Sequence, residues 1–148
     1  NRNAYLLSYS HKRIILDRQG RLPLTAKILA QADTVLVMGP FRQELADLGV
    51  LQLPVQPLKQ LLSQLAEQHQ IYDVLVEAGA TLSTAFLQEQ LVDELISYVA
   101  PTLLGQSART MFNAEFSLMA EQLRFKLRDV TRLGDDVRFR LIPFQETL

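Results

Sequence analysis

The order of apolar and polar positions along the chain alternates between short strand-like runs and longer helix-like segments. Residues 13–17 (RIILD) and 34–38 (TVLVM) are apolar and rich in β-branched side chains, which is typical of buried strands. A third run, residues 50–55, contains Pro54, whose missing N–H favours a place at the edge of a sheet. Residues 72–78 (YDVLVEA) have the same apolar character, and we expect them to form a central strand.

Two segments between these runs have helical spacing. Residues 56–70 place four leucines at i, i+3, i+4 and i+7, which predicts one apolar stripe of an amphipathic helix: Leu58, Leu61, Leu62 and Leu65. Residues 81–90 predict a second helix. Its expected buried side chains are Leu82, Ala85 and Phe86. Residues 93–101 return to a strand-like pattern, which stops at a proline.

The last part of the chain has a period of two. Residues 123–128 (LRFKLR) and 137–141 (VRFRL) alternate apolar and basic side chains, and the turn residues LGDD lie between them. This pattern predicts an antiparallel β-hairpin with one buried face. We therefore expect a single α/β domain over residues 1–148, with helices flanking a mostly parallel sheet that ends in this hairpin.

Composition narrows the class of protein. Apolar residues make up 48% of the 148 residues and charged residues 21%, which is typical of a globular domain. The net charge of −1 argues against a general nucleic-acid or anionic-membrane surface. Without cysteine there is no disulfide or thiolate metal site. No apolar run reaches a membrane span of roughly 18–20 residues, and the start lacks the order of a secretory signal, so we expect a cytoplasmic protein.

The stretch VLVEAGATLSTAF, residues 74–86, is the best candidate for a site. Glu77 closes an apolar run, and Gly79, Ala80 and Thr81 open a helix whose free N–H groups could face a phosphate. Three hydroxyl groups could add hydrogen bonds: Thr81, Ser83 and Thr84. On the residues alone, a plain strand–turn–helix corner is the better explanation, because no G-x-G-x-x-G or Walker motif is present. A carboxylate ending a buried strand nevertheless needs a partner or a ligand.

The remaining single candidates are weaker. Arg18 and Arg21 follow the first strand and could hold a phosphate, but solvated turn residues explain them better. Asp17 is expected to serve as a turn or cap residue instead of a catalytic acid. His11 and His69 lack ligand spacing and are expected at the surface, so no metal site is predicted.

A basic stripe follows the C-terminal hairpin, on Arg124, Lys126, Arg128, Arg138 and Arg140. No aromatic residue is interleaved on that face, and the chain is slightly acidic overall. A solvated sheet face or a subunit contact is therefore favoured over a nucleic-acid surface. No Ser-His-Asp signature or carboxylate pair is present.

Four segments together make a family resemblance. They are VEAG at 76–79, LVDEL at 91–95, AP at 100–101 with LLG at 103–105, and RIILDRQGRLPLTAKIL at 13–29. Their order and spacing resemble the reductase domain of the bifunctional riboflavin-biosynthesis deaminase–reductase family. The resemblance implies a dihydrofolate-reductase-like fold and NADPH-dependent reduction of the ribosyl group of 5-amino-6-(5-phosphoribosylamino)uracil to the ribityl chain.

The resemblance also implies roles for single residues. The glutamate matching Glu77 contacts the substrate, and no side chain of this chain is expected to act as a nucleophile. The matching cofactor contacts are Gly79, Ala80, Thr81, Leu82, Ser83, Thr84 and Ala85. Arg18 stands where the family usually has a small polar residue that touches NADPH, so it either meets the extra phosphate of the cofactor or points to solvent. Family members commonly form homodimers.

Two family features are absent from the sequence. The zinc deaminase signature, H-x-E with P-C-x-x-C, does not occur, so we expect no deaminase activity in this chain. The opening strand of the family's reductase domain is also missing, and we expect the chain to be a C-terminal part of that domain. Two alternatives follow. One is a related reductase of the same fold acting on another pterin-like or pyrimidine substrate. The other is a catalytically silent piece that dimerises and binds nucleotide weakly.

Overall fold

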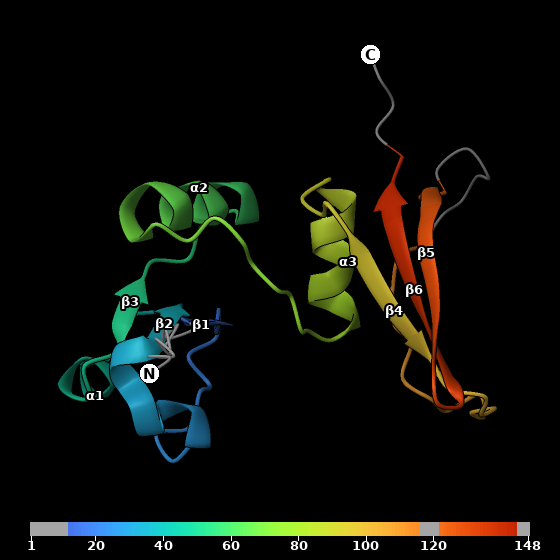
Figure 1. The fold of residues 1–148 in the computed structure, drawn as a ribbon. Helices are drawn as coiled ribbons and strands as arrows, with labels where there is room; N and C mark the ends of the chain where they lie inside the picture. Colours follow the sequence, from blue (N-terminus) through green and yellow to red (C-terminus); the bar gives the residue numbers. More distant parts are fainter. Residues whose placement is uncertain (1–11, 116–121, 145–148) are drawn as a thin grey trace, which may run out of the picture. The chain divides into compact units, whose positions relative to one another are not determined.

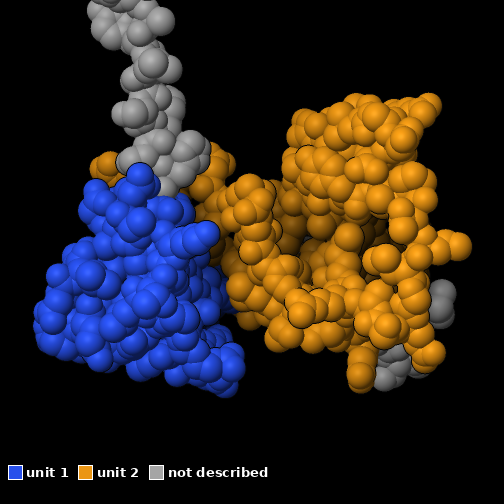
Figure 2. Space-filling model, turned by 90° about the horizontal axis from the view of Figure 1, so that it is seen from below, with its two compact units in different colours: residues 1–61 blue, residues 62–148 orange. Residues whose placement is uncertain are grey.

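The computed structural model describes residues 12–115 and 122–144 and has the α/β architecture that the sequence predicts. It divides into two compact units, residues 1–61 and 62–148, which Figure 2 shows in blue and orange. Each unit is described by itself. The single domain expected over the whole chain stays a prediction.

Unit 1 contains a parallel three-stranded sheet. Its strands are β1 (Arg13–Leu16), β2 (Val35–Met38) and β3 (Leu51–Leu53), with β2 in the middle (Figure 1). The three predicted strands are confirmed, and β3 lies at an edge, as its neighbouring proline led us to expect. A 3-10 helix, η1 (Lys27–Thr34), and a short helix, α1 (Gln43–Asp47), connect them.

The core of unit 1 surrounds β2. All four of its residues are at most 2% exposed, because a continuous apolar run can be buried on both faces of a parallel sheet. Val37 packs in one cluster with Leu29, Leu45 and Val50, which come from η1, α1 and the approach to β3. The helical connections therefore supply the cover that a parallel sheet requires.

The two predicted longer helices are both present. Helix α2 (Leu58–His69) buries most of the predicted stripe, with Leu58, Leu61 and Leu65 at most 2% exposed, whereas Leu62 is half-buried. Helix α3 (Ala80–Gln88) buries Thr84, Phe86 and Leu87, whereas the predicted Leu82 and Ala85 are only half-buried. None of the helices in the described ranges is long and apolar enough to cross a membrane.

The prediction of a central strand over residues 72–78 is wrong for this structure. The segment between α2 and α3 has no strand assignment and belongs to neither sheet (Figure 1). Its apolar side chains face solvent, with Tyr72 and Leu75 each 78% exposed. A strand needs neighbouring chain to satisfy its N–H and C=O groups, and neither sheet supplies a partner here.

Unit 2 contains an antiparallel three-stranded sheet. Its strands are β4 (Leu95–Val99), β5 (Phe125–Leu133) and β6 (Asp136–Pro143), with β6 in the middle. The predicted hairpin is confirmed: Leu133 pairs with Asp136, and the turn between them uses a glycine at φ +64°.

The apolar face of this sheet is only partly buried. Directly paired residues share a face in an antiparallel sheet, so Leu127 lies with Leu141, and Val130 lies with Phe139. Leu141 and Phe139 are half-buried, but Leu127 is 54% exposed and Val130 is 50% exposed. The buried face expected for the hairpin is therefore confirmed only in part.

Candidate functional site

The start of helix α3 has backbone donors without a partner among the described residues. Gly79 is the residue before the first helical turn, with φ −74° and ψ 171°, and no described side chain caps the helix. The first N–H groups of a helix have no acceptor within it, so they remain available to an external acceptor. A Cβ added at Gly79 would meet no atom within 4 Å. The space beside the Gly79 Cα is therefore open within unit 2.

Glu77 lies three residues before Ala80, the first residue of α3, and is exposed. It makes no hydrogen bond or ion pair with any residue in the described part of the chain. The expectation that Glu77 ends a buried strand is wrong, because the segment that carries it is solvent-exposed. Its carboxylate is therefore free to meet a ligand group.

Two threonines of α3 are held by a residue distant in the sequence. The backbone N–H of Asn113 donates to Thr84 Oγ1 at 3.0 Å, and Asn113 Nδ2 donates to Thr81 Oγ1 at 3.2 Å. Thr84 is only 5% exposed, so its hydroxyl needs the partner that Asn113 supplies. Sequence reasoning missed Asn113, because 29 and 32 residues separate it from these threonines and it belongs to no motif.

The proposed cofactor residues Gly79, Ala80, Thr81, Leu82, Ser83, Thr84 and Ala85 thus lie together in one turn and the first part of one helix. They do not share one environment, however. Thr81 is exposed, Thr84 is buried, and Ser83 donates a long hydrogen bond to the carbonyl oxygen of Ala78 at 3.4 Å. A ligand at the helix start would therefore reach Thr81 and the backbone before it reached Thr84.

Arg18 lies in unit 1, in a turn that the chain holds by its own contacts. The Asp17 carboxylate accepts hydrogen bonds from the N–H groups of Arg21 and Leu22, each at 2.8 Å, which confirms its predicted turn role. The Arg42 guanidinium donates to the carbonyl oxygens of Leu22 at 2.6 Å and Gly20 at 3.3 Å. Sequence reasoning missed this role of Arg42.

The side chain of Arg18 itself is exposed, and the structure gives it no hydrogen bond with a described residue. Arg18 belongs to unit 1, whereas Glu77 and the α3 start belong to unit 2. The contacts of Arg18 are therefore described within unit 1, and those of Glu77 and α3 within unit 2. The suggested contact of Arg18 with a cofactor phosphate stays a prediction.

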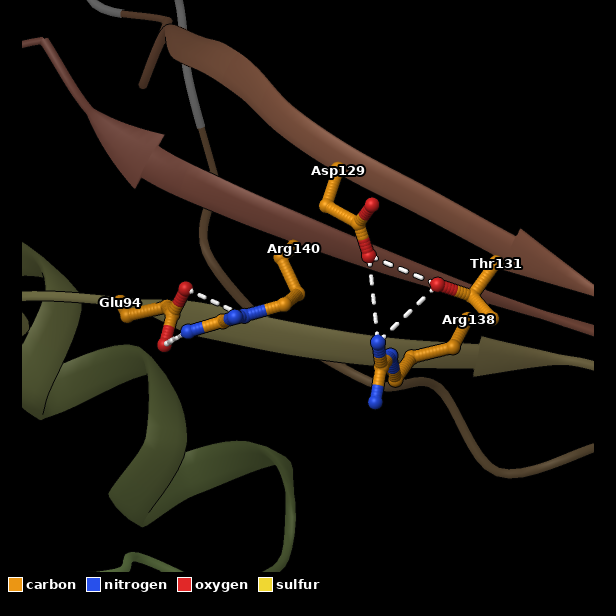
Figure 3. Close-up of polar contacts among 5 residues, drawn as sticks. All are labelled: Glu94, Asp129, Thr131, Arg138 and Arg140. Carbon is orange, nitrogen blue, oxygen red and sulfur yellow. Dashed lines mark hydrogen bonds and ion pairs between the residues drawn. The ribbon is translucent and has the colours of Figure 1, made fainter.

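The sheet of unit 2 carries two ion-paired clusters (Figure 3). Arg140 donates two 2.8 Å hydrogen bonds to the Glu94 carboxylate, while Arg138 donates to Asp129 at 3.1 Å and to Thr131 at 3.0 Å. The Arg140 hydrogen bond lowers the pKa of Glu94, and Glu94 in turn raises the pKa of Arg140. Hydrogen bonds from Thr131 and then from Arg138 lower the pKa of Asp129.

These pairs decide how the basic stripe is interpreted. Arg138 directs its charge to Asp129 on the neighbouring strand β5, and Arg140 directs its charge to Glu94, the residue before β4. Arg124 lies 6.0 Å from the ring centre of Phe144. The contacts favour a sheet-face role for these arginines over nucleic-acid binding.

Of the two histidines, the structure describes His69. His69 ends α2, and its Nε2 atom is buried without a hydrogen-bond partner among the described residues, so the expected surface position is wrong for this nitrogen. His11 lies outside the described residues. Residues 12–115 and 122–144 contain no group of three His, Cys, Asp or Glu side chains that could hold a metal ion.

Comparison with known proteins points to one family. The family model described as the RibD C-terminal domain matches residues 7–139. Among curated proteins, riboflavin biosynthesis protein RibD of Haemophilus influenzae is 32% identical over 136 residues, which cover 88% of this chain and 37% of that protein. A Buchnera aphidicola protein named 5-amino-6-(5-phosphoribosylamino)uracil reductase is 39% identical over 77 residues, covering 51% of this chain and 37% of its own length.

A solved structure agrees with these matches. The structure of Acinetobacter baumannii RibD is 74% identical, with a TM-score of 0.88, and the match covers 90% of this chain and 38% of that one. The present chain therefore spans well under half the length of the relatives that it matches.

Proposed function

The chain belongs to the RibD C-terminal domain family, and on that basis we propose that it takes part in a reduction step of riboflavin biosynthesis. The proposed reaction is the NADPH-dependent reduction of the ribosyl group of 5-amino-6-(5-phosphoribosylamino)uracil to a ribityl group. The name of the Buchnera relative gives this substrate class. NADPH, when bound, would supply the hydride for this reduction.

One observation carries the proposal: the uncapped start of α3 beside an open Gly79. The fold does not require a glycine there, because φ is −74° and an added Cβ would meet nothing within 4 Å. The missing side chain leaves room for a ligand to approach the first-turn N–H groups closely. The donors suit the phosphate groups of a dinucleotide, whose negative charge the positive end of a helix stabilises.

The residues of unit 2 then take separate roles. We assign the binding of NADPH to residues 79–85, in which the exposed hydroxyl of Thr81 would donate a hydrogen bond to the cofactor. We assign the orientation of the substrate to Glu77, whose carboxylate has no partner among the described residues and can accept hydrogen bonds from substrate hydroxyl or amine groups. The protein would contribute binding and orientation, and no side chain of this chain needs to act as a nucleophile.

Ligand-dependent melting tests the cofactor assignment. In full-length A. baumannii RibD, the segment that matches this chain is replaced by this chain. The resulting grafted protein contains this chain together with the rest of the relative. We expect NADPH to raise the melting temperature, since a ligand at about 100 times its Kd stabilises the folded state by about 2.7 kcal/mol. If saturating NADPH left the melting temperature unchanged, the cofactor assignment would be wrong.

Turnover tests the substrate role of Glu77. In the grafted protein, Glu77→Gln removes the negative charge and keeps the size of the side chain. We expect NADPH oxidation with the pyrimidine substrate to be lost, while NADPH-dependent melting stays as in the parent protein. Parental turnover in this variant would exclude the substrate role.

A catalytically silent piece is the second candidate, and residues 71–79 favour it. This segment, including Glu77, is exposed over most of its length. Unit 2 therefore supplies residues on one side of the proposed site, and a complete site needs residues from elsewhere. NADPH oxidation by the isolated chain and by the grafted protein separates the two candidates. Activity in the grafted protein alone would support the silent piece for the isolated chain. The expected homodimer is a further proposal, which the mass in solution tests.

A further inference from the structure

The contacts of Asn113 extend the proposed cofactor site to a residue outside residues 77–85. Asn113 lies in an irregular segment after β4, and its side chain is exposed. Its two hydrogen bonds reach α3 one turn apart, at Thr81 and Thr84, which are neighbours on one face of the helix. The segment around residue 113 is therefore attached to the turn of α3 that the proposed function uses.

The two hydrogen bonds have different consequences. The bond to Thr84 comes from the backbone N–H and ends on a buried hydroxyl, so it anchors the segment whatever side chain residue 113 carries. The bond to Thr81 comes from the side-chain amide and ends on an exposed hydroxyl. An oxygen that accepts from an amide still has its own hydrogen to donate, and this hydrogen turns away from the incoming donor.

We propose that Asn113 is a positioning residue for cofactor binding: by donating to Thr81 Oγ1, it orients the Thr81 hydroxyl as a donor toward an anionic group at the start of α3. The inference rests on the proposed function, because it takes the ligand to be a dinucleotide with phosphate groups. Donation into the Thr81 oxygen also polarises its O–H bond, which strengthens the hydrogen bond that this hydroxyl gives to a phosphate oxygen.

The test is Asn113→Ala in the grafted protein, which removes the amide and keeps the backbone bond to Thr84. We expect the KM for NADPH to rise about three- to tenfold with kcat unchanged, because a contact made equally in the ground state and the transition state affects binding alone. The melting temperature without ligand is expected to stay as in the parent. Gln106→Ala, which removes an exposed amide of the same segment, is the matched control and is expected to change neither quantity.

A double-mutant cycle separates positioning from general damage. Thr81→Val alone is expected to raise the KM at least as much as Asn113→Ala. Adding Asn113→Ala to Thr81→Val should then cause no further rise, because the amide acts through that hydroxyl. An aspartate at position 113 cannot donate to Thr81 Oγ1, and its carboxylate would accept the hydrogen of the Thr81 hydroxyl in place of the ligand. We therefore expect Asn113→Asp to raise the KM for NADPH more than Asn113→Ala does.

The outcomes distinguish this inference from the proposed function. If the parent grafted protein does not bind NADPH, the proposed function fails, and the inference fails with it. If the parent binds NADPH and Asn113→Ala binds it equally well, the inference alone is wrong. Additive losses in the double variant, or a loss explained by a lower melting temperature, would also overturn it.

Discussion

Two corners of the molecule are built from similar residues and use them differently. The corner after β1 combines the carboxylate of Asp17 with Gly39, which follows the neighbouring strand. The Asp17 carboxylate accepts two N–H groups of its own turn, and the Gly39 N–H donates to the carbonyl oxygen of Leu53 at 3.0 Å. The corner before α3 combines the carboxylate of Glu77 with Gly79, and the described residues give no partner to that carboxylate or to the Gly79 N–H.

The glycines make the difference clearest. A Cβ at Gly39 would stand 2.4 Å from the Asp17 carbonyl oxygen, so the fold itself requires a glycine there. A Cβ at Gly79 would enter open space. The first corner therefore satisfies its own polar groups, whereas the second leaves a carboxylate and a helix start for another molecule. Unused hydrogen-bonding capacity, more than residue type, marks the candidate site.

The largest expected effect comes from adding one methyl group at each glycine. Gly39→Ala should lower the free energy of unfolding of unit 1 by about 2–3 kcal/mol, because backbone atoms must move to relieve the overlap. Gly79→Ala should lower that of unit 2 by less than about 1 kcal/mol, the difference between glycine and alanine at a helix N-cap. Hydrogen exchange at amides of β2 and β6 reports the two units separately.

Equal losses for the two alanine variants would break the comparison, because both glycines would then be structural. In the grafted protein, Gly79→Ala should in addition weaken NADPH binding, whereas the apparent stability without ligand should hardly change. That combination is what a glycine kept for a ligand produces.

The next largest effect separates the two carboxylates. Asp17→Asn should lower the free energy of unfolding of unit 1 by about 1–2 kcal/mol, since charge-assisted hydrogen bonds to backbone N–H groups are lost. Glu77→Gln should change that of unit 2 by less than about 0.5 kcal/mol, as is usual for an exposed side chain. Denaturant titration followed by exchange of the same amides measures both. A loss above 1 kcal/mol for Glu77→Gln would show that Glu77 has a structural partner.

The comparison also explains what the sequence could predict. The strands of unit 1 and the C-terminal hairpin follow from local apolar patterns, a continuous run in 34–38 and alternation in 123–128 and 137–141. Residues 72–78 have an equally strong pattern but lie exposed without a strand partner. An apolar pattern indicates that side chains favour burial. Whether the segment forms a strand also depends on a neighbouring strand, which comes from another part of the sequence.

The candidate site divides in the same way. Glu77 and residues 79–85 are contiguous, so a short motif could indicate them. Asn113 and Arg42 act through contacts made 20 to 32 residues away in sequence, and these depend on how irregular segments return to the elements they touch. Neither residue type at its position signals such a contact in advance.

The smallest expected effect concerns carboxylates of unit 2 that, unlike Glu77, have partners. Arg140 holds the pKa of Glu94 below its ordinary value, and Thr131 with Arg138 does the same for Asp129. A carboxyl group with a lowered pKa in the folded state contributes stability above its unfolded pKa. That stability is lost as the pH falls through the pKa of the folded state. The free energy of unfolding of unit 2 should therefore decrease by a small amount when the pH drops below about 4.

Exchange of β6 amides between pH 7 and pH 3, corrected for the intrinsic pH dependence of exchange, measures this loss. Arg140→Gln should reduce the loss of stability at low pH, because the Glu94 carboxylate then lacks the ion pair that favours its ionised form in the folded state. Arg132→Gln is the matched control: its contact with Asp135 spans 3.6 Å between side chains at least 78% exposed, and such pairs contribute little. An identical acid dependence in the Arg140 variant would mean that the paired and unpaired carboxylates of unit 2 do not differ energetically, and the distinction that singles out Glu77 would lose its basis.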